Sequence, residues 1–96
     1  MIIDLDAHQG NGHERDFIND KNVFIVDMYN HNIYPADRYA KEAINVDISV
    51  WPRTHTTIYL EKLRDRIPNA IDSFKPDFIL YNAGTDCMEG DPLGNL

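Results

Sequence analysis

The sequence has few of the groups that would suit a chain to an oxidising compartment, a membrane or a nucleic acid. Its one cysteine, Cys87, can form no disulfide within the chain, which favours a reducing, intracellular compartment. No apolar run approaches the length of a membrane span, and the acidic residues Asp4 and Asp6 argue against a secretion signal at the start. The formal net charge of −7 argues against a nucleic-acid partner and would weakly attract a basic substrate.

Short apolar segments alternate with segments of helical pattern along the chain. Strands are expected over residues 1–3, 23–26, 44–50 and 78–81, and helices over residues 13–18, 37–41 and 60–74. We expect residues 29–34 to form a loop, Thr54 or Thr56 to cap the last helix, and Pro68 to kink or split it. The length of 96 residues suggests one domain at most, and the alternation predicts an α/β fold with a parallel sheet.

Ionisable side chains follow the first and the last of the expected strands. Asp4, Asp6 and His8 would share one face if the first strand continued, and Asp86 follows the last strand. Because ligands gather beyond the carboxyl ends of parallel strands, we expect these groups to meet there. Asp6, His8 and Asp86 offer the three ligands of a catalytic zinc site, with Asp4 behind them as an orienting acid. The alternative is that these acids cap helices and line a solvated loop.

Other polar residues carry weaker signals. Residues 10–12 (Gly-Asn-Gly) lack the third glycine of a dinucleotide-binding loop, and no strand ends in the lysine that a phosphoacceptor domain would need. His13 and Glu14 are expected on the solvated face of a short helix, and Asp91 is equally well explained as a turn residue. The residues for which a structural role is the simpler interpretation are Tyr29, His31, Tyr34, Tyr39, His55 and Cys87.

Three segments carry a family resemblance. Asp4-Leu5-Asp6-Ala7-His8-Gln9-Gly10-Asn11-Gly12, then Tyr81-Asn82-Ala83-Gly84-Thr85-Asp86 with Glu89-Gly90-Asp91, and the stretch 29–41 between them resemble the histone deacetylases of the arginase/deacetylase fold. The closest likeness is to the class IV branch. The resemblance implies a three-layer α/β fold, of which residues 1–96 would form the central, metal-binding part of a deacetylase domain.

The resemblance also implies an activity, which is the zinc-dependent hydrolysis of acyl-lysine amides in proteins or peptides. Asp6, His8 and Asp86 match the zinc ligands of the family, and Asp4 matches a buried acid that supports a catalytic histidine. The loop 29–41 is expected to line the acyl channel. A potassium site is implied as well, although the family usually presents a hydroxyl where Asp27 falls. Its ligands, mostly backbone oxygens, would be Asp4, Asp6, His8, Asp27 and Met28.

The sequence departs from the family pattern in groups that carry out the reaction. Gly10 stands where arginase-type relatives carry an acid for a second metal, so a binuclear manganese site is disfavoured. The family's paired histidine and its Gly-Gly-Tyr have no counterpart within residues 1–96, and we therefore expect little turnover from these residues alone. The alternative function is a non-catalytic metal-binding or protein-interaction module. Exposed edges of the sheet are expected to allow self-association.

Overall fold

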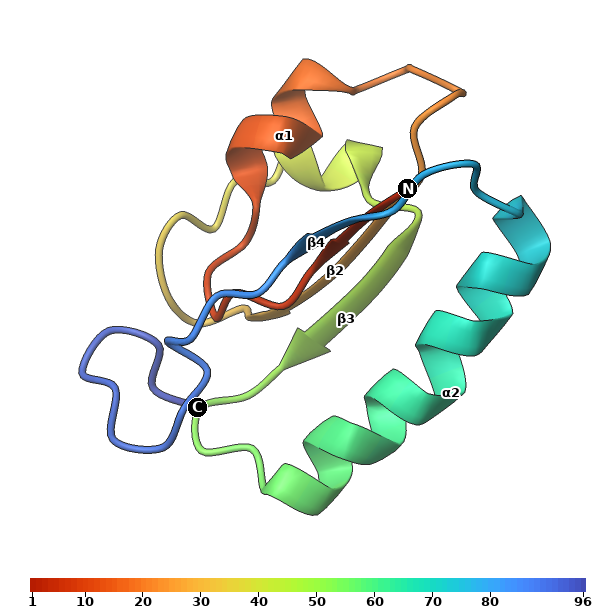
Figure 1. The fold of residues 1–96 in the computed structure, drawn as a ribbon. Helices are drawn as coiled ribbons and strands as arrows, with labels where there is room; N and C mark the ends of the chain where they lie inside the picture. The colour runs from red at the N-terminus through yellow and green to blue at the C-terminus, as the bar shows by residue number, and fades with distance from the viewer.

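Four parallel strands form the centre of the computed structural model, which describes all of residues 1–96 (Figure 1). The strands lie side by side in the order β3-β2-β1-β4, and every neighbouring pair is parallel, as the alternation of the sequence predicts. The elements along the chain are β1 (Ile2–Asp4), α1 (Asn11–Asp16), β2 (Ile25–Asn30), the 3-10 helix η1 (Ala40–Ala43), β3 (Val46–Val50), α2 (Thr56–Phe74) and β4 (Leu80–Asn82).

The sheet lies between two helical layers. On one face α2 covers the main apolar core, against which its Leu63, Ile67 and Phe74 pack. On the other face lie α1 and η1, close to each other (Figure 1). The arrangement is therefore the three-layer α/β fold that was predicted. The fully packed members of the core are Met1, Ile3, Val26, Met28, Ile48, Val50 and Ala70.

The face of the sheet toward α1 carries a row of polar residues in register. Asp4 is paired with Asp27 of β2 on one side and with Asn82 of β4 on the other, and Asp27 is paired in turn with Asp47 of β3. Asp4 and Asp27 are 2% and 0% exposed. Since successive side chains of a strand alternate between faces, these acids point away from the apolar core that Ile3 and its neighbours form. The polar face leads directly to the carboxyl ends of β1 and β4.

Some of the predicted element bounds are wrong. β2 continues to Asn30, so Tyr29 and Asn30, which were expected in a loop, are buried residues of a strand covered on both faces. A 3-10 helix over Ala40–Ala43 replaces the helix expected at 37–41. The helix expected at 13–18 begins and ends two residues earlier, as α1.

The long helix α2 runs unbroken through Pro68. Proline removes one backbone hydrogen bond, but the apolar side chains on both sides of it pack on the sheet and hold the helix together. The cap also differs from expectation, because His55 rather than a threonine accepts a hydrogen bond from the Thr57 amide at 3.2 Å. Neither α2 nor any other helix of the structure combines the length and the apolar character that a membrane span requires.

Candidate metal centre

Three potential metal ligands meet beyond the carboxyl ends of β1 and β4. Asp6 and His8 lie in the loop between β1 and α1, and Asp86 lies in the loop that follows β4. One ligand atom from each residue can be chosen so that all three lie within 4.8 Å of one another. His8 Nδ1 is 2.6 Å from Asp86 Oδ2 and 3.1 Å from Asp6 Oδ1. The structure thus brings together the three predicted ligands, although β1 ends at Asp4 and does not continue to His8.

Backbone amides orient both carboxylates of this group. The amide of Ala7 donates to Asp86 Oδ1 at 2.8 Å, and the amide of His8 donates to Asp6 Oδ1 at 2.8 Å. Burial by itself would raise the pKa of Asp86, but the hydrogen bonds from the Ala7 amide and the His8 ring outweigh it and lower the pKa below its usual range. Asp86 is therefore a carboxylate at neutral pH.

The donor set is chemically suited to a divalent metal. Two carboxylates and one imidazole are ligand types that zinc accepts, and three protein ligands leave one coordination position open. The side chains of Asp6, His8 and Asp86 are 32%, 27% and 20% exposed, so solvent and small ligands can reach the group.

Asp4 lies behind the ligands and connects the two loops that carry them. Its Oδ1 accepts hydrogen bonds from the Asp6 amide and from Asn82 Nδ2, both at 2.9 Å. Its Oδ2 lies 2.8 Å from Nε2 of His13 on α1. The expectation that His13 is solvated is therefore wrong, because its side chain is only 23% exposed and is paired with a buried acid.

Glu14 was also expected at the solvated surface, and it is fully buried. Gln9 Nε2 donates to Glu14 Oε2 at 2.6 Å, and the Gly10 amide donates to Asp27 Oδ2 at 2.9 Å. Burial, together with the neighbouring Glu14 carboxyl, raises the pKa of Asp27 to about 10. Asp27 is therefore protonated at neutral pH. Asp27 Oδ1 and Glu14 Oε1 are both buried and have no hydrogen-bond partner.

Other residues considered from the sequence lie outside the group. Asp91 Oδ1 accepts hydrogen bonds from the amides of Leu93 and Gly94, both at 2.8 Å, so it sets a turn. His31 Nδ1 lies 2.8 Å from the Val50 carbonyl oxygen, and its ring packs edge-on against Trp51. The contacts of Asp91 and His31 therefore stabilise loops and do not involve the three potential metal ligands.

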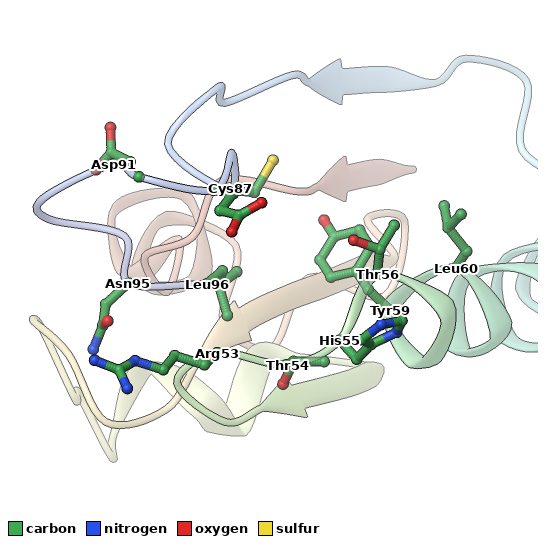
Figure 2. A pocket seen from close by; sticks show the side chains of 12 residues that line it. Arg53, Thr54, His55, Thr56, Tyr59, Leu60, Cys87, Asp91, Asn95 and Leu96 are labelled. Atoms are coloured by element: carbon green, nitrogen blue, oxygen red, sulfur yellow. The ribbon is translucent and has the colours of Figure 1, made fainter.

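A cavity of about 820 Å³ has a lining that does not include Asp6, His8 or Asp86; Figure 2 shows the side chains that line it. It is lined by residues from the start of α2 and from the last loop, including Tyr59, Cys87 and Leu96. Of the lining residues, Cys87 is next in sequence to Asp86, and its Sγ lies 3.4 Å from the Gly84 carbonyl oxygen. The cavity and the group formed by Asp6, His8 and Asp86 are therefore separate features of the structure.

Comparison with known proteins explains this arrangement. All of residues 1–96 match the family model of the histone deacetylase domain. The chain belongs to the histone deacetylase family. It is similar to Histone deacetylase 2 of Arabidopsis thaliana, with 52% identity over 96 residues that cover 100% of this chain and 25% of that protein. It is also similar to a probable deacetylase of Archaeoglobus fulgidus, with 31% identity over 102 residues that cover 99% of this chain and 28% of that protein.

Solved structures of histone deacetylases show the same fold. The HDA15 HD domain matches with a TM-score of 0.79 and 28% identity, covering 98% of this chain and 30% of that domain's chain. The histone deacetylase Clr3 matches with a TM-score of 0.78, covering 98% of this chain and 18% of its own; at 22% identity it supports the fold alone. The chain therefore has the arginase/deacetylase fold, and it spans 25% of the length of its Arabidopsis relative.

Gly84 is a further residue on which the geometry of this histone deacetylase site depends, and it was not identified from the sequence. A Cβ atom at position 84 would lie 2.5 Å from Asp6 Oδ2 and 2.6 Å from Asp6 Cα. The absence of a side chain at Gly84 is what allows the loop that carries Asp86 to approach Asp6. The only signal in the sequence is its place two residues before Asp86.

We expect Gly84→Ala to push Asp6 away from His8 and Asp86 and to weaken zinc binding about tenfold or more, the loss typical of misplaced ligands. A competition titration against a chromogenic chelator measures the affinity. Gly12→Ala is the matched control, because a Cβ atom there meets nothing within 4 Å. Equal zinc affinities of the two variants would contradict the prediction.

Proposed function

We propose that residues 1–96 form the metal-binding central segment of a zinc-dependent lysine deacetylase or deacylase. The observation that carries the proposal is the convergence of Asp6, His8 and Asp86, with an open side, in a chain of the histone deacetylase family. When bound by these residues, zinc would polarise a carbonyl as a Lewis acid and lower the pKa of a coordinated water to about 7.

The other residues of the site would hold and orient the ligands. The amides of Ala7 and His8 fix the two carboxylates, and Asp4 ties the two loops together. In the intact enzyme Asp4 would also support the catalytic histidine of the family. Hydrogen bonds of this kind around a metal site commonly change its affinity or activity by about 10- to 100-fold.

The proposed substrate is an acyl-lysine side chain of a protein or peptide. Residues 29–41 would line the channel that receives it, which is supported by the exposure of Tyr34 and Tyr39, at 79% and 52%. The net charge of −7 favours a basic substrate. The unpaired Cys87 supports a place of action in the cytoplasm or nucleus.

A potassium ion is a second part of the proposal. The carbonyl oxygens of Asp6 and His8 accept no backbone hydrogen bond, which supports their role as ligands. Backbone oxygens of Asp4, Asp27 and Met28 would complete the set. Asp27 carries a carboxyl group where the family usually presents a hydroxyl, and its Oδ2 accepts a hydrogen bond from the Gly10 amide. The site would therefore depend mainly on the backbone.

We expect the folded chain to bind about one zinc ion, because it has one group of three protein ligands. Asp86→Asn should abolish stoichiometric binding, since the amide keeps an acceptor for the Ala7 amide but loses the charge that attracts the metal. Elemental analysis after zinc loading and dialysis measures the stoichiometry. Asp72→Asn, the same change on the exposed surface of α2, is the control. A wild-type chain without zinc, or an Asp86→Asn chain that retains it, would refute the metal site.

We expect residues 1–96 alone to show little or no turnover of acetyl-lysine or long-chain acyl-lysine peptides. They contain neither a pair of adjacent histidines nor a Gly-Gly-Tyr, and losing such acid–base and oxyanion groups costs about 10²- to 10⁴-fold in rate. A fluorogenic peptide assay with zinc-loaded chain checks this. The His8→Ala variant is the control, because any turnover that it retains comes from a contaminating enzyme. Zinc-dependent turnover that His8→Ala removes would show that the expectation is wrong.

A second candidate function, a protein-interaction module, is favoured by the edge of the sheet at β4. Phe78, Leu80 and Tyr81 are 72%, 49% and 58% exposed, and an open edge strand can pair with another chain.

We therefore expect concentration-dependent self-association, measured by light scattering. Tyr81→Lys should weaken it by placing a charge on the edge, whereas Ile58→Lys, at an exposed position of α2, should not. A chain that stays monomeric at high concentration would count against this function.

A further inference from the structure

We infer that His13 is a positioning residue of the candidate metal centre, which it supports by holding the carboxylate of Asp4. The inference rests on the proposed function in so far as the ligands it positions are Asp6 and Asp86. His13 makes no hydrogen bond to Asp6, His8 or Asp86, so its effect must pass through Asp4.

The first argument is the set of hydrogen bonds around Asp4. His13 Nε2 engages Oδ2, which leaves Oδ1 directed at the Asp6 amide and at Asn82 Nδ2. Asp4 is 2% exposed, so water cannot readily replace a lost partner. Without the His13 contact, the carboxylate would be free to rotate and to release the amide of Asp6. That amide lies two residues before His8, whose own amide holds the Asp6 carboxylate.

The second argument is the glycine beside the pair. A Cβ atom at Gly10 would collide with His13 Nε2 and would lie 2.6 Å from Asp4 Oδ2. The φ of Gly10 is −77°, a value that any residue adopts, so its backbone conformation does not require glycine. The position requires glycine because the His13–Asp4 pair occupies the space of a side chain.

The third argument is that His13 makes its bond to Asp4 at a cost on the other side of the ring. His13 Nδ1 is buried and has no hydrogen-bond partner, which is unfavourable for the folded state. An apolar side chain would remove this unpaired nitrogen, but it would also leave Asp4 Oδ2 without its donor. The ring makes one side-chain hydrogen bond, and that bond goes to the acid that connects both ligand loops.

The test compares three variants of the full chain. His13→Leu removes the donor and keeps the volume, and His13→Gln keeps an N–H donor. Arg15→Ala is the control on the same helix, because it breaks the ion pair of α1 with Asp37, at 2.6 and 2.9 Å, and leaves Asp4 untouched. The first measurement, on metal-free protein, is the hydrogen-exchange rate of the Asp6 amide by NMR. The second is the zinc affinity together with the visible spectrum of the cobalt-loaded chain.

We expect His13→Leu to speed exchange of the Asp6 amide at least about tenfold, to weaken zinc binding by about 10- to 100-fold and to alter the cobalt spectrum. His13→Gln should restore most of the exchange protection, the zinc affinity and the cobalt spectrum of the wild type. Arg15→Ala should lower stability but leave these three properties unchanged. The inference is overturned if His13→Leu matches the wild type in exchange and affinity, or if Arg15→Ala gives the same losses.

Two measurements on the wild type keep the outcomes separable. A slowly exchanging His13 Nε2 proton supports the pair even if His13→Leu fails to fold, and a rapidly exchanging one overturns it. If the wild type binds no zinc, the proposed function fails, while exchange of the Asp6 amide in the metal-free variants still decides the role of His13.

Discussion

The carboxylate of Asp4 is the group on which the arrangement of the site depends. A buried carboxylate is costly unless donors replace the water it loses, and Asp4 obtains donors from three places: the loop after β1, the end of β4, and α1. Because each donor must reach the same two oxygens, the three segments have fixed positions relative to one another. The segments that carry Asp6 and Asp86 are therefore brought together before any metal is considered.

A second constraint follows from the register of the sheet. The parallel pairing of β1 with β2 sets Asp27 directly beside Asp4, and both are buried. Two neighbouring buried carboxylates cannot both carry a charge at low cost. Burial and Glu14 raise the pKa of Asp27 to about 10, so Asp4 can accept its hydrogen bonds beside a neutral neighbour. Keeping that proton costs stability at neutral pH, since the unfolded chain releases it and the folded chain does not. Glu14 is thus part of the support of the site.

The fold and the convergence of Asp6, His8 and Asp86 could be predicted from the sequence because they follow from rules that act over short stretches. Alternating apolar strands and helical segments indicate a parallel sheet, and its carboxyl ends collect the residues that follow the strands, Asp6, His8 and Asp86. The burial of His13 and Glu14 could not be predicted in this way. Helix α1 has 6 residues, which is too few for a periodic pattern. Its buried face is set by contacts with residues outside the helix: Gln9 bonds to Glu14, and Gly10 bonds to Asp27 of the sheet. The expectation that Pro68 could split the last helix was wrong for a similar reason, because α2 packs on the sheet on both sides of the proline.

Gly10 connects the chemistry of the site with its packing. In the sequence it stands where arginase-type relatives carry an acid for a second metal, which favours a single metal here. In the structure the space that such a side chain would need is filled by the His13–Asp4 pair. An aspartate at position 10 could not enter without displacing that pair, and with it the hydrogen bond that orients Asp6. The predicted preference for one metal and the His13–Asp4 pair therefore involve the same small volume beside Gly10. It follows that a side chain can be added at position 10 only if the His13–Asp4 pair is displaced.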